Sequence, residues 1–412
     1  MTPGLTEAGV RNELRSWLDH AWDPDLGLIE WRQRLVASGW AVPSWPTRWH
    51  GRDMPTWVDK VVADEFRAMG VVGPPLGSGM SLAAPTLLEH GSDELNERLL
   101  RPTLTGELRW CQLFSEPGAG SDLAGLSATA TRDGDEWVLN GQKVWNTSAQ
   151  YADVAILLAR TDRDVPKHQG ISYFVLPMRQ QGVEVRPIAQ MNGHASFNEV
   201  FLTDARIPVA NLVGALGDGW RIARTTLSHE RTFATLRQPR YSTGAGRERR
   251  AIVEAEAEAA EHFKTYVWYP QRAGRADLVI DRARAKGMAT DPVIRQEIAR
   301  LLSFARANEW TAARARDARA LGRPPGPEGS IGKLAASEVA RLAARVHTRI
   351  AGASATLTTG PDPVDAIVAE VLVSTPAQSI AGGTDEIQRN IIGENILGLP
   401  REPVAETGSL PR

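Results

Sequence analysis

The sequence predicts an α+β protein with an N-terminal helical domain at residues 1–105, a central antiparallel β-barrel or sandwich at 106–215 and a C-terminal helical bundle at 216–412. Three observations support this class. Apolar residues recur with helical spacing before residue 105, short alternating segments separated by turn dipeptides follow, and helical spacing returns beyond Gly219. A chain of 412 residues with 42% apolar content exceeds one core, so several packed regions are expected.

The N-terminal region is predicted to be helical because its apolar residues fall on one face of a helix. Val10, Leu14 and Leu18 show this spacing, and Val58, Val62 and Phe66 show it again. Proline and glycine near 43–54 and 71–77 are expected to form the connecting loops.

The central region reads as a meander of short strands. Asp133-Gly134 predicts a tight turn before a strand at Trp137, Asn140-Gly141 predicts a second turn, and Lys143–Thr147 is expected to form the next strand. Further strands are expected at 154–159, 171–176, 183–187 and 200–202.

The C-terminal region shows helical periods at 294–305 and 334–350, which favour a bundle of long amphipathic helices. An insertion is expected near 238–290. Within it, the acidic, alanine-rich run Glu254–Glu261 has no stripe of large apolar residues, so we expect a solvated helix or an insertion outside the core.

Composition excludes several function classes. The 47 basic and 49 acidic residues are mixed along the chain and give a net charge of -2, so we predict no nucleic-acid partner. The single cysteine, Cys111, is expected to be a buried apolar residue, and neither a disulfide framework nor a metal site is predicted. Acidic residues among the first thirty and the absence of a long apolar stretch predict a cytoplasmic protein without a membrane span.

Three segments carry residues that could bind a ligand. The turn at 114–122 combines glycines with the hydroxyls of Ser115 and Ser121, and the segment 140–147 places Trp145 and Thr147 two residues apart, where a flat ring could lie against the indole. At 381–390, two glycines precede Thr384, an N-cap candidate whose helix start favours a negatively charged oxygen. Taken singly, each also fits an ordinary role: a loop connection, a core tryptophan and a helix start.

Taken together, these segments resemble the acyl-CoA dehydrogenase family of flavoproteins, and the resemblance covers nearly the whole chain. The most specific matches are Glu116-Pro117-Gly118-Ala119-Gly120-Ser121-Asp122, Asn140-Gly141-Gln142-Lys143-Val144-Trp145, Phe197-Asn198-Glu199-Val200 and Gly382-Gly383-Thr384-Asp385-Glu386-Ile387-Gln388-Arg389.

The resemblance implies an FAD-dependent enzyme that removes hydrogen from the α and β carbons of an acyl-CoA thioester and yields a trans-2-enoyl-CoA. It also implies that electrons pass to an electron-transferring flavoprotein. Residues carried over as isoalloxazine-lining are Gln112, Phe114, Ser115, Trp145 and Thr147, while Gly383, Thr384 and Glu386 would also contact FAD. Ser121 would meet the flavin or the pantetheine arm of the substrate.

The catalytic base is predicted to be Glu230. Many family members carry the glutamate just before the Gly-Thr pair, where this chain has Gly382, which can supply only a backbone N–H to the enolate oxygen. A minority branch, including enzymes for branched and long acyl chains, places the glutamate on a bundle helix before an arginine, and this chain reads Glu230-Arg231 there. Arg231 is carried over as a substrate contact, and His229 is expected to be structural.

One departure from the family bears on assembly. Typical homotetramers use an arginine followed three residues later by Phe-Gly to hold the FAD pyrophosphate of a neighbouring subunit, and no such run occurs between 231 and 300. The chain is therefore expected to form a homo- or hetero-oligomer, a dimer or a tetramer, similar to bacterial relatives that act on sterol side chains. Two alternatives remain open: a partner subunit with an incomplete flavin site, and a flavin oxidase or monooxygenase on the same fold.

Overall fold

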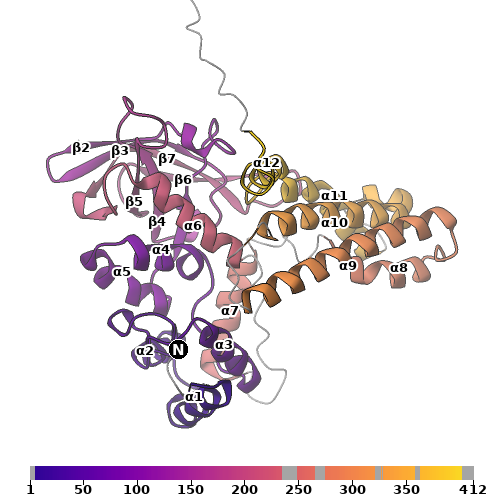
Figure 1. Ribbon diagram of the computed structural model, residues 1–412, viewed down its shortest axis with the longest axis horizontal. Helices are drawn as coiled ribbons and strands as arrows, with labels where there is room; N and C mark the ends of the chain where they lie inside the picture. The colour runs from indigo at the N-terminus through magenta and orange to yellow at the C-terminus, as the bar shows by residue number, and fades with distance from the viewer. Residues whose placement is uncertain are drawn as a thin grey trace, which may run out of the picture. The chain divides into compact units, whose positions relative to one another are not determined.

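The computed structural model describes residues 5–233, 248–264, 274–320, 326, 328–357 and 362–400. The chain divides into two compact units, one formed by Met1–Tyr266 and the other by Val267–Arg412 (Figure 1). Each unit has its own hydrophobic core, so each is described by itself.

The first unit begins with helices that contribute to two apolar clusters. They are α1 (Glu7–Ala21), α2 (Leu28–Ala37), α3 (Trp57–Met69), a π-helical turn η2 (Gly79–Ala83), α4 (Ala84–His90) and α5 (Asp93–Thr105). Helices α1, α2 and α3 bury their faces together, whereas α4 and most of α5 pack into the cluster that also includes the sheet that follows. Thr6 caps α1 by accepting a hydrogen bond from the Gly9 N–H, and the predicted stripe Val10, Leu14 and Leu18 is buried in the first of these clusters.

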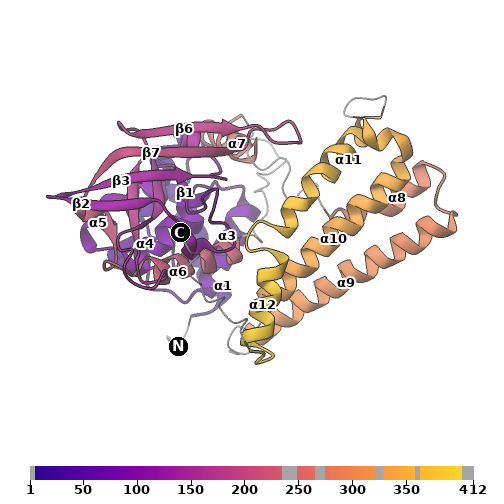
Figure 2. The same cartoon turned by 90° about the horizontal axis from the view of Figure 1, so that it is seen from above.

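A mostly antiparallel sheet follows. Its strands are β1 (Trp110–Leu113), β2 (Thr129–Asp133), β3 (Glu136–Lys143), β4 (Val154–Arg160), β5 (Ile171–Pro177), β6 (Val183–Ile188), β7 (Phe197–Pro208) and β8 (Leu212–Val213). The strand order is β6-β7-β3-β2-β4-β5-β8, and β1 pairs with β4. The contacts of β4 with β1 and β2 are parallel. Figure 2 shows β6, β7, β3 and β2 side by side.

The predicted turn at Asn140-Gly141 is wrong. Strand β3 runs through both residues to Lys143, and its register with β7 shifts between Leu139 and Gly141, which marks a β-bulge. Gly141 adopts a φ of 145°, and a Cβ there would lie 2.5 Å from the Cβ of Ala128. The bulge therefore requires glycine, and Trp145 and Thr147 lie beyond the strand rather than on it.

Two more helices complete the first unit. Helix α6 (Gly219–Phe233) packs against β5, α4 and η2, and Figure 1 shows it crossing the sheet. Helix α7 (Arg250–Lys264) packs against α2.

The expectation that the run Glu254–Glu261 lies outside the core is wrong. Ala251, Ala255 and Ala259 are buried at four-residue spacing along α7. Glu254 accepts a hydrogen bond from the Leu28 N–H, and Glu258 pairs with buried Arg32. Helix α7 thus buries one face made of alanines and Ile252, and Ile252 and Ala255 belong to the cluster of the N-terminal helices.

The second unit is helical among its described residues. It contains α8 (Val279–Ala285), α9 (Pro292–Ala320), α10 (Glu328–Ala351), α11 (Pro363–Ser374) and α12 (Asp385–Asn395), and α10 contacts the other four. Figure 2 shows α9 and α10 side by side. Helical regions flanking a mostly antiparallel sheet confirm the predicted fold class, whereas the predicted boundaries at 105 and 215 and the insertion near 238–290 stay predictions. No helix in the described ranges is long and apolar enough to cross a membrane.

Candidate active site

The turn that follows β1 is closed by its own backbone. Glu116 and Ala119 exchange two N–H···O bonds of 3.0 Å, so Pro117 and Gly118 form the tip. Gly118 and Gly120 are exposed, and a Cβ added to either would meet no atom within 4 Å. Ser121 is exposed just beyond them. The tip of this turn therefore has open space beside Gly118 and Gly120.

A buried ion pair lies beneath the turn. Lys143, fully buried at the end of β3, donates from Nζ to Glu116 Oε1 at 2.8 Å. The Glu116 carboxylate also accepts bonds from the Ser127 N–H at 2.6 Å, the Ser127 hydroxyl at 2.7 Å and the Ala128 N–H at 2.9 Å. Both charges are therefore paired and hydrogen-bonded, which a buried ion pair requires.

Burial and pairing act in opposite directions on both charges. Burial lowers the pKa of Lys143 to about 8, and Glu116 opposes the shift. Burial alone would raise the pKa of Glu116, but Lys143 and the Ser127 donors outweigh it and hold that pKa below its ordinary value.

The segment 143–146 fixes the backbone of the segment 112–115. Lys143 Nζ donates to the Phe114 carbonyl at 3.2 Å, the Val144 N–H donates to the Ser115 carbonyl at 2.9 Å, and Asn146 Nδ2 donates to the Gln112 carbonyl at 2.8 Å. Three backbone carbonyls of segment 112–115 thus accept hydrogen bonds from segment 143–146, and both segments contain residues predicted to line the flavin. The two motifs, some thirty residues apart in sequence, form one rigid surface.

Trp145 projects from this surface. Its side chain is 58% exposed and its backbone has a φ of 64°, a left-handed conformation that is unusual for a bulky residue. The ring of Phe197 lies edge-on at 5.8 Å. Strained residues occur preferentially at ligand sites, and an exposed indole held from one side offers a flat apolar face.

Asn198 attaches the Phe197-Asn198 motif to the same surface. Asn146 and Asn198 exchange two backbone bonds of 3.1 Å, and Asn198 Nδ2 donates to the Asn146 carbonyl at 2.8 Å. Both asparagines are buried, and their Oδ1 atoms have no hydrogen-bond partner among the described residues. The structure thus joins the first three motifs of the sequence.

Glu230 stands at the end of the buried stripe of α6. Ile222, Ala223 and Thr226 are fully buried against β5, α4 and η2. Glu230 follows Thr226 by one helical turn and therefore continues the same face, where it is half-buried. The side chain of Arg231 lies outside the described part of the structure.

Two histidines adjoin this end of α6. His90, at the end of α4, lies with Nε2 2.9 Å from the Thr225 hydroxyl, and His229 is half-buried. Burial lowers the pKa of both rings, and Glu89 opposes the shift.

The fourth motif belongs to the second unit. Gly382 and Gly383 have φ of 67° and 83°, and the amide of Gln388 lies 3.3 and 3.4 Å from their carbonyl oxygens as a donor. The Thr384 hydroxyl accepts a bond from the Ile387 N–H at 3.2 Å, which confirms the predicted N-cap of α12. Glu386, in the first turn, is exposed.

Asp385 holds the start of α12 on α10. Its buried carboxylate accepts bonds from Arg341 at 2.8 Å and Lys333 at 3.4 Å, and Lys333 also donates to the Gln378 carbonyl at 2.5 Å. Burial would raise the pKa of Asp385, but the two cations outweigh it and lower that pKa. The glycine loop is thereby fixed at both ends.

In the surface formed by segments 112–115 and 143–146, the Gln112 and Ser115 carbonyls are bonded to Asn146 and Val144, next to the exposed Trp145, and Thr147 follows as a half-buried residue. Phe114 differs, because its ring is buried beneath that surface. Glu116 and Lys143 both belong to the motifs found in the sequence, but their ion pair was not predicted. The available signal was a lysine on the inward face of β3, where Trp137 and Leu139 precede it. The predicted roles of the site residues remain predictions.

Models of three domains match this chain. The acyl-CoA dehydrogenase N-terminal domain matches residues 6–107, the middle domain 111–205 and the C-terminal domain 275–397. Glu230 lies between the second and third matches.

Similar proteins agree with these matches. The acyl-CoA dehydrogenase IpdE1 of Mycobacterium tuberculosis is 36% identical over 90% of this chain and 88% of its own length. A structure titled Tcur3481-Tcur3483 steroid ACAD has a TM-score of 0.67 at 25% identity, covering 96% of this chain and 98% of its own. The ChsE4-ChsE5 complex from Mycobacterium tuberculosis has a TM-score of 0.65 at 26% identity, covering 98% and 100%. The chain therefore belongs to the acyl-CoA dehydrogenase family.

Proposed function

We propose that this acyl-CoA dehydrogenase converts an acyl-CoA thioester to the trans-2-enoyl-CoA, with Glu230 as the base and an electron-transferring flavoprotein as the electron acceptor. The observation that carries the proposal is the position of Glu230, which is half-buried at the end of the buried stripe of α6. The same unit contains the surface formed by segments 112–115 and 143–146, from which Trp145 projects. A carboxylate partly shielded from water is suited to removing a proton from carbon.

The residues of the first unit fit FAD, the cofactor of this family. A flat ring can lie on the exposed indole of Trp145. Gln112, Ser115 and Thr147 would line the isoalloxazine, with the buried ring of Phe114 packed behind them, and Ser121 from the open turn would contact another part of the cofactor. Gly383, Thr384 and Glu386 are proposed as FAD contacts on the family resemblance alone. When bound, FAD supplies the acceptor for the hydride that leaves the β-carbon.

The chain's own residues must manage the α-proton. A hydrogen next to a thioester carbonyl is weakly acidic, so its removal requires a base at contact distance and donors at the enolate oxygen. Glu230 is proposed to take the proton, Arg231 to contact the substrate and the Gly382 N–H to donate to the oxygen. Gly382 suits this task because its left-handed φ is set by the Gly-Gly turn and does not depend on a side chain.

Anaerobic reduction of the flavin by a panel of acyl-CoA esters tests the proposal. The panel includes linear, branched and steroid-side-chain thioesters, because one structural neighbour is titled a steroid ACAD. Wild type should bleach the flavin absorbance and yield the 2-enoyl product with at least one ester. Glu230→Gln should lose roughly 10²- to 10⁴-fold in rate while holding FAD. Full activity of this variant would refute the base assignment.

Two other functions give different results in the same preparation. Hydrogen peroxide formed at the catalytic rate without an added electron acceptor would identify a flavin oxidase. A partner subunit is favoured by the two neighbours titled as pairs of proteins, ChsE4-ChsE5 and Tcur3481-Tcur3483. A chain that binds FAD near one per subunit only after a homologous subunit is added would support that role.

A further inference from the structure

Three buried hydroxyls meet where α6 crosses β5. They belong to Thr86 on α4, Tyr173 on β5 and Thr226 on α6, and all three residues are fully buried. The Thr226 Oγ1 lies 3.0 Å from the Thr86 hydroxyl, 3.1 Å from the Tyr173 hydroxyl and 3.2 Å from the Ile222 carbonyl. One side chain of α6 thus connects the helix to two other elements.

The direction of these bonds follows from the atoms available. The Ile222 carbonyl can only accept, so the single proton of Thr226 is donated to it. The oxygen of Thr226 then accepts from Tyr173 and from Thr86, which uses both lone pairs. Every bonding capacity of the Thr226 hydroxyl is therefore filled, and buried networks that are fully satisfied fix a unique packing.

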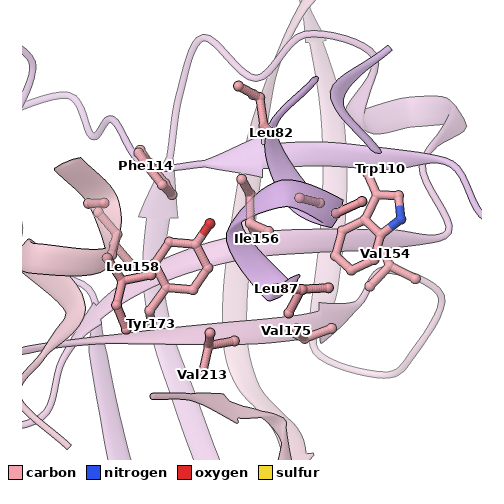
Figure 3. Packing of buried hydrophobic residues seen from close by; sticks show 14 of the residues in the cluster. Leu82, Leu87, Trp110, Phe114, Val154, Ile156, Leu158, Tyr173, Val175 and Val213 are labelled. Atoms are coloured by element: carbon pink, nitrogen blue, oxygen red, sulfur yellow. The ribbon is translucent and has the colours of Figure 1, made fainter. Parts of the chain in front are cut away.

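This cluster lies between the ring-lining segment and the predicted base. The ring of Tyr173 stands edge-on to Phe114 with centroids 5.8 Å apart, and Figure 3 shows both rings in the same buried cluster. On the other side, Thr226 precedes Glu230 by one turn of α6. A chain of direct contacts therefore runs from Phe114 through Tyr173 and Thr226 to the turn that carries Glu230.

We propose that Tyr173 and Thr226 are positioning residues that set the separation between the Phe114 segment and the carboxylate of Glu230. The proposal rests on the proposed function, because it assigns a task to the placement of the base. Proton removal from carbon is sensitive to such placement, and a displacement of about 1 Å can cost on the order of 100-fold in rate.

Thr226→Val and Thr226→Ser separate positioning from packing. Valine keeps the shape but leaves the Tyr173 and Thr86 hydroxyls without their acceptor, whereas serine restores the oxygen. We expect Thr226→Val to lower kcat roughly 10- to 100-fold, to raise the kinetic isotope effect of an α-deuterated substrate and to leave the FAD affinity unchanged. Thr226→Ser should recover most of kcat. Tyr173→Phe, which removes one donor, should show the same changes to a smaller extent.

Thr103→Val is the matched control. Thr103 is also buried in this unit and accepts a bond from Trp110 Nε1 at 2.8 Å, but it lies on α5 and has no bond to the described side chains of α6. If Thr103→Val and Thr226→Val lose similar thermal stability yet only Thr226→Val changes the isotope effect, the positioning role is supported. Equal kinetic losses in both variants would overturn it.

Amide hydrogen exchange of the full chain supplies a readout that does not depend on catalysis. Thr226→Val should exchange faster in α6, and Thr103→Val should not. Unchanged exchange in α6 would overturn the proposal even if activity fell. If Glu230→Gln is fully active, the base assignment fails. If Thr226→Val speeds amide exchange in α6 but leaves the isotope effect unchanged, Thr226 does not position the base.

Discussion

The two units hold their predicted ligand-binding segments in different ways. In the first unit, one buried pair, Glu116 and Lys143, fixes the turn after β1, and both side chains are almost fully buried. In the second unit, Asp385 is held by Arg341 and Lys333, whose side chains are partly exposed. Two buried partners therefore support the first site, whereas the second depends on a buried carboxylate whose cationic partners reach water.

This difference predicts how much stability each site loses when one charged partner is removed. A buried charge that loses its partner remains in a low-dielectric surrounding, which is costly. A charge with two partly exposed partners can exchange a lost bond for water at smaller cost. Mutations of equal chemistry should therefore have larger effects at the Glu116–Lys143 pair than at Asp385.

The largest effect is expected from Lys143→Met. It leaves the Glu116 carboxylate buried without its cation, so we expect a loss of about 3–5 kcal/mol in unfolding free energy, together with loss of FAD binding. Urea denaturation and flavin fluorescence titration measure the two. The double variant Lys143→Met/Glu116→Gln should recover part of the stability, because no unpaired charge remains.

Arg206→Met is the control for that prediction. Arg206 pairs with Asp133 at 2.8 Å and Glu136 at 2.9 Å on the same sheet, but all three side chains are exposed. Its loss should change stability and FAD binding little. If the exposed and buried variants behave alike, the contrast between buried and exposed pairs is wrong.

Acidification should affect the first unit more than the second. Burial is the main cause that lowers the pKa of His50, His90, His229 and His262 in the first unit, and of His347 alone in the described part of the second. Each ring binds its proton at lower pH when folded than when unfolded, so the stability it contributes is present above pH 6.5 and is lost as the pH falls through the folded pKa.

Thermal unfolding between pH 7 and 5 measures this loss, and hydrogen exchange assigns it to a unit. Faster exchange at pH 5 should appear in α4 and α6 before it appears in α10, after correction for the intrinsic pH dependence of exchange. Earlier opening of α10 would contradict the assignment.

Asp385→Asn should have a moderate effect. It removes the charge that Arg341 and Lys333 share but keeps an oxygen acceptor, so we expect a loss of about 1–3 kcal/mol and faster exchange at the start of α12. Asp281→Asn is the matched control, because Asp281 forms an exposed pair with Arg284 on α8. A loss as large as that of Lys143→Met would remove the distinction between the units.

The smallest stability effect is expected from Trp145→Gly. Glycine adopts a φ of 64° without strain, and this gain offsets the lost contact with Phe197, so stability should stay within about 1 kcal/mol of wild type. FAD affinity should nevertheless fall, since the exposed indole face is gone. Undiminished FAD binding would show that the ring does not lie on Trp145.

Local signals in the sequence were sufficient for part of the fold. Asp133-Gly134 predicted the turn between β2 and β3, where Gly134 has a φ of 62°, and Thr384 predicted the cap of α12. Both depend on residues within a few positions of each other. Asn140-Gly141 misled, because pairing of β3 with β7 continues past the glycine and converts a turn signal into a bulge.

Distant pairings could not be predicted in the same way. Glu116 and Lys143 lie 27 positions apart, and their contact depends on how the turn after β1 folds over β3. Likewise, the alanines of α7 pack on α2 only because the chain returns to the N-terminal helices more than 200 residues later. The tertiary placement of these segments, not their local preference, decides the outcome.

The central claim is that Glu230 removes the α-proton, and exchange of that proton with solvent tests it without any oxidation. A substrate analogue with sulfur in place of the β-carbon has no β-hydrogen to lose, so only the proton step can occur. In D₂O, wild type should incorporate deuterium at the α-carbon of this thioester, and Glu230→Gln with bound FAD should not. Deuterium incorporation by Glu230→Gln at the wild-type rate would contradict the account.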